Sequence, residues 1–165
     1  MTGTAIHLKP GDVHFGPAPG RLGTLLGSCV AVTLWHPRRA LGGMCHVVFP
    51  DGPVQPTATR ECDNRYARCA FQFMADCVAA FGTRAGDYRV GLFGGGDMFA
   101  DLTRRGFPAI GDRNVRRARD LLAQYGFRID HQHVGGRIYR RVELDLGNGR
   151  VGMAATRVQP AQTLG

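Results

Sequence analysis

The sequence contains no hydrophobic run long enough to cross a membrane. Its first ten residues have neither a basic start followed by an apolar stretch nor a cleavage site, so no secretory leader is expected. Internal repeats and low-complexity segments are also missing. We therefore expect a cytoplasmic protein without membrane insertion. Its 165 residues, 44% of them hydrophobic, predict a single domain over 1–165 with flexible ends at about 1–4 and 157–165.

Cysteine pairs of the CxxC type are absent, and the number of cysteines is odd. This pattern indicates neither a zinc ribbon nor a disulfide framework. We expect all five cysteines to be free thiols, at positions 29, 45, 62, 69 and 77. Cys69 and Cys77 fall on one predicted helix, where they are expected to be small apolar fillers rather than a metal pair.

Lysine occurs only at position 9, so arginine supplies nearly all of the 21 basic residues and the net charge of +8. A basic surface would attract acidic partners. A codon bias toward arginine would produce the same composition. The arginines are scattered and lack interleaved stacking aromatics, so a nucleic-acid partner is not expected.

The order of predicted elements is mostly β, with two helices inserted. We predict an α/β fold of the α+β layered kind, with two main helices on a mixed, largely antiparallel sheet. Apolar periodicity predicts helices over 63–81 and 115–125, stopped by Gly82 and Gly126, the second capped by Asp112 or Asn114. At most one short strand is expected before residue 20. The predicted strands are 5–8, 29–35, 43–49, 88–93, 127–134, 137–146 and 150–156.

The chain is organised around the hairpin formed by strands 29–35 and 43–49, with a turn over 36–39. A turn centred between Pro37 and Arg38 would place Cys29 opposite His46, unless a bulge at Gly42-Gly43 shifts the register. Side-chain alternation then leaves one core face and one face free for chemistry. The predicted core face carries Val30, Val32, Leu34, Cys45, Val47 and Phe49.

Cys29 and His46 are the candidate nucleophile and base. An imidazole opposite a thiol can take its proton and leave a thiolate. Gly27 and Ser28 precede the cysteine, and a glycine there allows the sharp backbone and exposed amides that an oxyanion site needs. Residues 94–97 lack the pattern of a phosphate loop, so we expect a tight turn near the site.

The other histidines are weaker candidates. His7, His14 and His36 lie in polar or turn segments, where a solvated side chain is expected. His131 and His133 alternate along a strand, but no third ligand of matching parity accompanies them.

Several segments resemble the chemoreceptor glutamine deamidase family, CheD. The similarity spans roughly residues 5–156, and the Gly-Ser-Cys element paired with Gly-Gly-x-x-His is its most specific part. The matching segments are Thr24-Leu-Leu-Gly-Ser-Cys29-Val-Ala-Val, Gly42-Gly43-Met-Cys-His46 with Pro50, Arg65-Tyr66, Phe93-Gly94-Gly95 with Met98-Phe99, Ile110-Gly111-Asp-Arg113-Asn114, Val134-Gly135-Gly136 and the hairpin over 140–149.

The resemblance implies a bacterial, cytoplasmic hydrolase of chemotactic signal transduction that converts glutamine side chains of chemotaxis receptors to glutamate and releases ammonia. It implies the phosphatase CheC as a further partner, and no metal or organic cofactor. On this match Cys29 is the nucleophile, His46 the base, and Thr24 orients the imidazole. Gly27, Ser28 and Gly43 would shape the site. Cys45, which departs from the expected pattern, is assigned to the core by parity.

The implied chemistry passes through a thioester between Cys29 and the glutamine carbonyl, and His46 supplies the proton for departing ammonia. A cysteine peptidase or acyl transferase would use the same pair of residues. A non-catalytic module that binds CheC or a receptor is the third possibility. Residues 51–59 and 94–99 are the predicted sites of glutamine selection.

Overall fold

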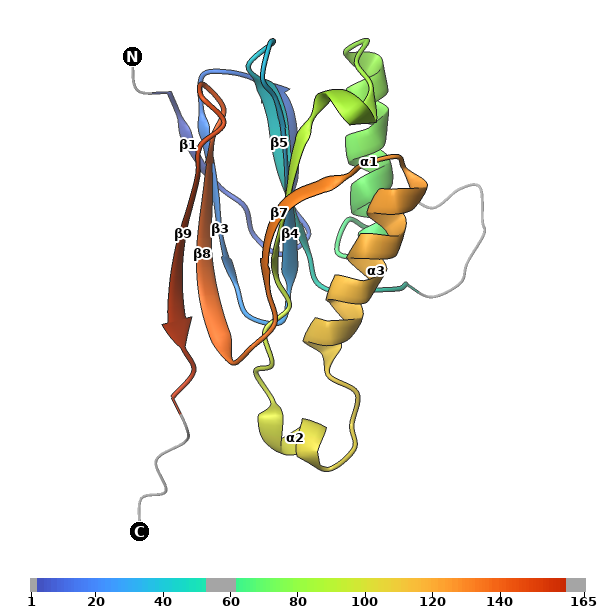
Figure 1. Cartoon of the computed structure of the whole chain (residues 1–165), viewed down its shortest axis with the longest axis vertical. Coiled ribbons are helices and arrows are strands. Elements are labelled where there is room, and N and C mark those ends of the chain that lie inside the picture. Colours follow the sequence, from blue (N-terminus) through green and yellow to red (C-terminus); the bar gives the residue numbers. More distant parts are fainter. Residues whose placement is uncertain (1–2, 53–61, 160–165) are drawn as a thin grey trace.

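The computed structural model describes residues 3–52 and 62–159, which fold into three layers (Figure 1). A four-stranded sheet in the order β1-β3-β8-β9 lies against a five-stranded sheet in the order β2-β5-β4-β6-β7. The helices α1 and α3 cover the other face of the five-stranded sheet. The bounds are β1 Ala5–His7, β2 Val13–Pro17, β3 Arg21–Leu26, β4 Val30–His36, β5 Leu41–Val47, α1 Ala67–Ala80, η1 Ala85–Asp87, β6 Arg89–Gly94, α2 Ala100–Arg104, α3 Ile110–Gln124, β7 Ile129–Val134, β8 Ile138–Asp145 and β9 Val151–Arg157.

The predicted α+β layered class is confirmed, and each sheet is mixed, with a single parallel pair among the described strands. The prediction of a single sheet is wrong. Most of the flexible ends predicted from the sequence lie outside the described residues. Arg157, at the start of the predicted C-terminal end, still belongs to β9. Among the described helices, α1 and α3 are the longest at 14 and 15 residues, and neither is long and apolar enough to span a bilayer.

β4 is buried along its whole length because both of its faces meet other layers. Val30, Val32 and Leu34 pack toward the helices, whereas Ala31 and Trp35 pack toward the four-stranded sheet. The predicted assignment of one core face and one open face is therefore wrong. The second face of the hairpin belongs to another apolar layer, and any chemistry on that face occurs where the two sheets meet.

The hairpin of β4 and β5 is confirmed, but its register differs by two residues from the prediction. His36 pairs with Leu41, so the connecting loop is 37–40 and His46 pairs with Ala31 rather than Cys29. Ala40 adopts a φ of 45° within this loop. The longer loop moves the centre of the hairpin by one residue and each pair by two. Because an even shift preserves side-chain alternation, Cys29 and His46 remain on one face.

Four elements are missing from the prediction, namely β2, β3, η1 and α2. β2 pairs along the edge of β5, so it gains its partner from a strand distant in sequence. The start of α3 is also earlier than predicted, at Ile110, with Ala109 at the N-cap. Asp112 and Asn114 therefore lie inside the helix and do not cap it. Gly82 and Gly126 do follow their helices, with φ of 71° and 82°.

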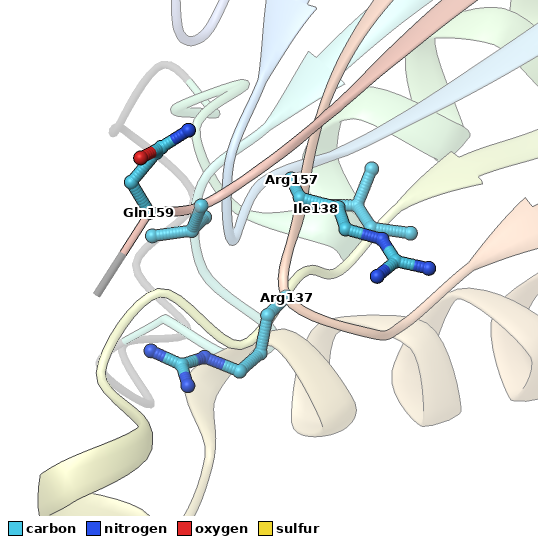
Figure 2. Close-up of a pocket in the computed structure, with 5 residues that line it drawn as sticks. Arg137, Ile138, Arg157 and Gln159 are labelled. Atoms are coloured by element: carbon cyan, nitrogen blue, oxygen red, sulfur yellow. The ribbon is translucent and has the colours of Figure 1, made fainter.

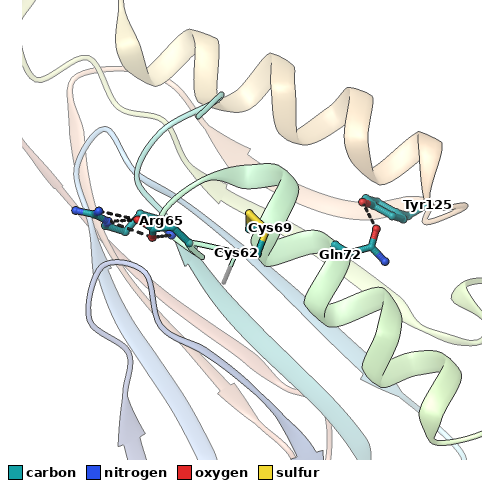
Figure 3. The surroundings of a disulfide bond; sticks show 6 residues. Cys62, Arg65, Cys69, Gln72 and Tyr125 are labelled. Carbon is teal, nitrogen blue, oxygen red and sulfur yellow. Dashed lines mark hydrogen bonds and ion pairs between the residues drawn. A yellow bond between two sulfur atoms is a disulfide. The ribbon is translucent and has the colours of Figure 1, made fainter. Parts of the chain in front are cut away.

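Cys62 and Cys69 form a disulfide, so the prediction of five free thiols is wrong for this pair (Figure 3). The chain before α1 turns back on the first helical turn and brings their Cα atoms to 5.4 Å, within the usual range for a bridge. The seven-residue spacing between the two cysteines does not predict that the chain folds back in this way. Cys29, Cys45 and Cys77 are free thiols.

Arg140 joins the two sheets close to the end of β6. Its side chain, only 1% exposed, donates from Nε to His133 Nδ1 at 2.8 Å and from its two terminal nitrogens to the carbonyls of Gly94 and Gly135. Burial lowers the pKa of Arg140. None of the described carboxylates forms an ion pair with it. The guanidinium therefore holds neighbouring backbone segments through hydrogen bonds alone.

Arg140→Met is expected to lower the free energy of unfolding by about 1–3 kcal/mol, because the buried Gly94 carbonyl and the part-buried acceptors on His133 and Gly135 lose their donor. Urea denaturation measures this change. Arg141→Met is the matched control, since Arg141 is exposed and its loss should change stability by no more than about 0.5 kcal/mol. Equal losses in the two variants would contradict a specific role for Arg140.

Candidate active site

The loop between β3 and β4 carries Gly27, Ser28 and Cys29, and the glycine run after β6 holds it in place. The N–H of Gly95 donates to the Cys29 carbonyl at 2.8 Å, and the N–H of Gly96 donates to the Gly27 carbonyl at 2.9 Å. Gly94, with a φ of 109°, leaves no room for a Cβ, which would overlap the Cys29 carbonyl. The run therefore packs closely against the Cys29 loop, near the site as predicted, but 94–97 form no hydrogen-bonded turn of their own.

Thr24 and His46 meet across the gap between the two sheets. The hydroxyl of Thr24, on β3, lies 2.6 Å from His46 Nδ1, on β5, and also donates to the Leu8 carbonyl at 2.8 Å. A threonine hydroxyl has one proton. Because that proton is given to Leu8, the Thr24 oxygen accepts from His46, and Nδ1 carries the imidazole proton.

This tautomer leaves His46 Nε2 as an unprotonated nitrogen. Nε2 is buried and has no hydrogen-bond partner among the described residues. His46 is 3% exposed, and burial lowers its pKa from 6.5 to about 4, against a smaller opposing effect of Asp12. The imidazole is therefore neutral at neutral pH, with its basic nitrogen free.

Cys29 is half-buried and packs at the margin of the apolar layer between the sheets. It directly precedes Val30, the first residue of β4, which pairs with Val47, so Cys29 lies just beyond the last pair of the ladder, and no hydrogen bond joins its thiol to His46 Nε2. Burial raises the pKa of the Cys29 thiol, although its own backbone N–H lowers it slightly. The resting thiol is therefore protonated and needs a base to become nucleophilic.

The backbone around the thiol offers hydrogen-bond donors. The N–H groups of Ser28 and Cys29 donate to no backbone carbonyl within the described parts of the chain. They lie beside the thiol in a loop whose shape is fixed by the glycine run. Two N–H groups in this position can bind an oxygen that becomes negatively charged during a reaction at the thiol.

Gly43 is not brought to this group. It pairs with Leu34 on one side and Phe15 on the other, in the middle of the sheet, where a Cβ would overlap the His14 carbonyl. Gly43 therefore lets the neighbouring strands pack closely and does not shape the site. Cys45 is fully buried in the layer facing the helices, and burial raises its pKa to about 12, so its thiol stays neutral.

The remaining histidines are outside this group, although His7 lies close enough to His46 to lower its pKa. His36 was expected to be solvated, but it is 7% exposed and packs edge-on against Tyr88. The expectation is wrong because His36 is the last residue of β4 rather than part of the turn. His131 and His133 are exposed on β7, and His133 accepts a hydrogen bond from Arg140.

Asn114 is the residue near the site that the sequence interpretation missed. Its side-chain amide donates at 3.0 Å to the carbonyls of Ser28 and Val48, and the residue is fully buried. The signal was present in the sequence. Asn114 precedes Val115 in the apolar stripe of α3, and a polar residue at the edge of a buried stripe needs specific partners.

Two pockets lie on the four-stranded sheet near the Cys29 loop. One, of about 530 Å³, opens beside Gly27 and is also lined by Leu25, Tyr139 and Arg141. The other, of about 610 Å³, lies where β8 begins and β9 ends (Figure 2). Its labelled side chains are Arg137, Ile138, Arg157 and Gln159. Neither pocket is lined by Cys29 or His46.

His46 is expected to make the fold sensitive to acid. Its pKa is about 4 when folded and 6.5 ordinarily, so between these values the unfolded chain binds a proton that the folded chain does not. Stability is therefore lost as pH falls from 6.5 to 4, by about 3 kcal/mol from this residue. His46→Gln should lose that much less over the same range in urea denaturation. Parallel pH profiles for the two proteins would contradict the assignment.

The fold and these side chains define a class of protein. Two stacked sheets bring a half-buried thiol and a neutral imidazole of fixed tautomer to one face, and the backbone N–H groups beside the thiol bind no backbone carbonyl among the described residues. Cysteine-dependent hydrolases use this combination.

Comparisons with known proteins identify the family. The sequence model for CheD chemotactic sensory transduction matches residues 48–155. The Probable chemoreceptor glutamine deamidase CheD 3 of Dechloromonas aromatica is 42% identical over 149 residues, covering 90% of this chain and 86% of the relative. The Probable chemoreceptor glutamine deamidase CheD of Pseudomonas fluorescens is 44% identical over 150 residues, covering 90% and 82%. The chain belongs to the CheD family.

The long alignments extend beyond the segment matched by the family model. They leave out only about a tenth of the chain, which is too little to exclude Cys29 or His46. A more distant relative, the Probable chemoreceptor glutamine deamidase CheD 1 of Leptospira interrogans, is 31% identical over 151 residues and covers 88% of this chain and 89% of its own. The similarity therefore includes the loop that carries Cys29 and the strand that carries His46.

Proposed function

We propose that this protein is a cysteine-dependent glutamine deamidase, an amidohydrolase that converts glutamine side chains of bacterial chemotaxis receptors to glutamate. The observation that carries the proposal is the 2.6 Å contact between Thr24 and His46 Nδ1, which leaves the basic Nε2 free. The names of the relatives, all chemoreceptor glutamine deamidases, support the substrate. Cys29, His46 and Thr24 are the proposed catalytic group.

The reaction begins from a neutral pair. His46 Nε2 takes the thiol proton as Cys29 Sγ attacks the carboxamide carbon of a receptor glutamine. The carbonyl oxygen becomes negative and is bound by the N–H groups of Ser28 and Cys29. When the tetrahedral adduct collapses, the C–N bond breaks, and the proton on Nε2 passes to the departing nitrogen. Ammonia leaves, and a thioester links Cys29 to the substrate.

The second half of the reaction uses the same base. His46 Nε2 takes a proton from water as the water oxygen attacks the thioester carbon. The C–S bond then breaks, the proton returns to the sulfur, and the product is glutamate. Thr24 keeps the Nδ1 proton in place throughout, so Nε2 is the nitrogen that exchanges protons. The residues that supply these steps are all part of the chain, so no metal or organic cofactor is assigned a role.

The surroundings of the loop suggest how a protein substrate is received. Met98 and Tyr139 lie against Gly27, where a Cβ would come within 3.3 Å of the Met98 side chain. These side chains border the approach to the Cys29 loop, and 94–99 remains a proposed element of glutamine selection. The other proposed element, 51–59, lies outside the described residues apart from its first two. We propose CheC as a further partner and the cytoplasm as the location.

Intact mass measurement of a receptor cytoplasmic fragment, incubated with this protein, tests the proposal. Deamidation predicts a unit mass gain for each converted glutamine, together with one ammonia in a coupled enzymatic assay. Cleavage of the fragment would identify a peptidase instead, and transfer to an added amine an acyl transferase. An unchanged mass despite stable association with the fragment would identify a binding module. Each of these last three outcomes would overturn the proposed function.

A further inference from the structure

Asn114 connects the two parts of the chain that carry the proposed nucleophile and base. Its amide nitrogen lies 3.0 Å from the carbonyl oxygen of Ser28, which precedes Cys29, and 3.0 Å from that of Val48, two residues after His46. The side chain comes from α3, on the other side of the five-stranded sheet from Thr24. We propose that Asn114 is a positioning residue that holds Cys29 and His46 in register. This inference rests on the proposed function.

The two hydrogen bonds of Asn114 matter because of where the Ser28 and Val48 carbonyls lie. The ladder between β4 and β5 ends with the pair Val30 and Val47, so Ser28 and Val48 lie just beyond the last paired residues. No β-ladder bond is made between the strands past that point, within the residues that the structure describes. The two carbonyls share one nitrogen and therefore lie less than twice 3.0 Å apart. Asn114 replaces the missing ladder bonds at the point where Cys29 begins.

The orientation of the amide is determined by its partners. With nitrogen toward the carbonyls, both amide protons of Asn114 are used; with oxygen there, three acceptors would face one another. The amide oxygen is buried and unpartnered among the described residues. An unsatisfied buried acceptor costs about 1–3 kcal/mol, so an apolar residue would serve packing better. The two donated bonds are what an asparagine adds here.

The helical turn that carries Asn114 packs directly against the glycine run beside the site. Gly111, one helical turn earlier in α3, approaches the carbonyls of Gly95 and Gly96 so closely that a Cβ would lie 2.5 Å from each. These are the glycines whose N–H groups hold the Cys29 loop. The first turns of α3 therefore contact the loop at both Gly111 and Asn114, and Asn114 also hydrogen-bonds Val48, directly after the strand that carries His46.

Asn114→Asp tests the inference because it changes the donor and keeps the shape. The carboxylate cannot donate, and it would repel the Ser28 and Val48 carbonyls. Since a misplacement of the order of 1 Å costs about 10²-fold, kcat for deamidation should fall by about 10²-fold while KM changes by less than about twofold. Asn148→Asp is the matched control. Asn148 lies in the exposed β8–β9 turn at the other end of the sheets, and its oxygen accepts from Arg150, which an aspartate also does.

The alkylation rate of Cys29 separates positioning from general loosening of the fold. Peptide mapping after iodoacetamide treatment follows Cys29 and Cys77 in one sample. Loss of register should slow alkylation of Cys29 near neutral pH and move its pH profile to that of an unassisted thiol, with Cys77 unchanged. Faster alkylation of both cysteines would indicate general opening and overturn the inference. Asn114→Ser, which keeps one donor, should show an intermediate effect, and it serves if the aspartate variant does not fold.

A double-mutant cycle completes the test. If Asn114 acts through the relation between Cys29 and His46, then Asn114→Asp should change the rate little in a His46→Gln background. Equal effects with and without His46 would overturn the inference, as would an Asn114→Asp protein with unchanged kcat. Failure of the proposed function appears differently, as an absence of deamidation by the unsubstituted protein, and the alkylation measurements would still report on Asn114.

Discussion

Replacing Cys29 by serine is expected to lower deamidation by at least about 10⁴-fold, because the hydroxyl is a far weaker nucleophile at neutral pH and His46 alone cannot attack the amide. The loss should fall on kcat, since the N–H groups that bind the substrate oxygen remain. Ammonia release and intact mass of a receptor fragment measure the change. Stability should be close to that of the unsubstituted protein, because Cys29 lies at the margin of the apolar layer.

Cys77→Ser is the control for this substitution. Cys77 is the other free thiol that is not fully buried, and it lies on α1, away from the loop. Its replacement should leave deamidation unchanged. Hydroxylamine added to the unsubstituted protein should divert the thioester, giving a glutamyl hydroxamate on the receptor fragment and none with Cys29→Ser. A serine variant that retained a tenth of the activity would exclude Cys29 as the nucleophile.

Most of the longer elements of the fold could be predicted from local patterns, whereas β3 and the assembly of the strands could not. Alternating apolar residues and a Pro-containing turn located the β4–β5 hairpin, and apolar periodicity located α1 and α3. β2 and the division into two sheets depend on pairings between distant segments. β3 joins β8, more than a hundred residues later in the chain, through six paired positions. No local pattern specifies such a partner.

The candidate site shows the same division. Face alternation assigned Cys29 and His46 to one side of the hairpin, and this survived a register error of two residues because parity did not change. Thr24 entered through family resemblance, and its contact with His46 depends on how the sheets stack. Asn114 was interpreted as a helix cap because its partners, Ser28 and Val48, are carbonyls of distant segments. Every residue has a backbone carbonyl, so the sequence does not show which carbonyls a side chain will bind.

The stacking of the sheets also determines the protonation of the site. An imidazole on an open hairpin face would have a pKa close to 6.5 and would be partly charged at neutral pH. Under the four-stranded sheet, the pKa of His46 is about 4 and its Nδ1 is bound to Thr24. The layer that was predicted to be open is therefore what keeps the base neutral and selects its tautomer.

Loss of the base should be the second largest effect. His46→Gln is expected to lower kcat by about 10²–10⁴-fold, the usual contribution of a positioned general base. With His46 present, kcat should be level near neutral pH and fall only as pH approaches about 4, where the imidazole takes up a proton. With glutamine, the rate should instead rise with pH as the thiol ionises, because burial raises the pKa of Cys29. Steady-state rates over this pH range measure the difference.

Thr24→Val is a milder substitution that tests the role of His46 through its partner. Valine has nearly the shape of threonine but cannot accept the Nδ1 proton, so a fraction of His46 would carry its proton on Nε2, facing the thiol. We expect a smaller loss, about 10–10²-fold, and no further loss when Thr24→Val is combined with His46→Gln. Independent effects in the double variant would mean that Thr24 does not act through His46. An acid limb near the ordinary histidine pKa in the unsubstituted protein would show that the buried imidazole is not the base.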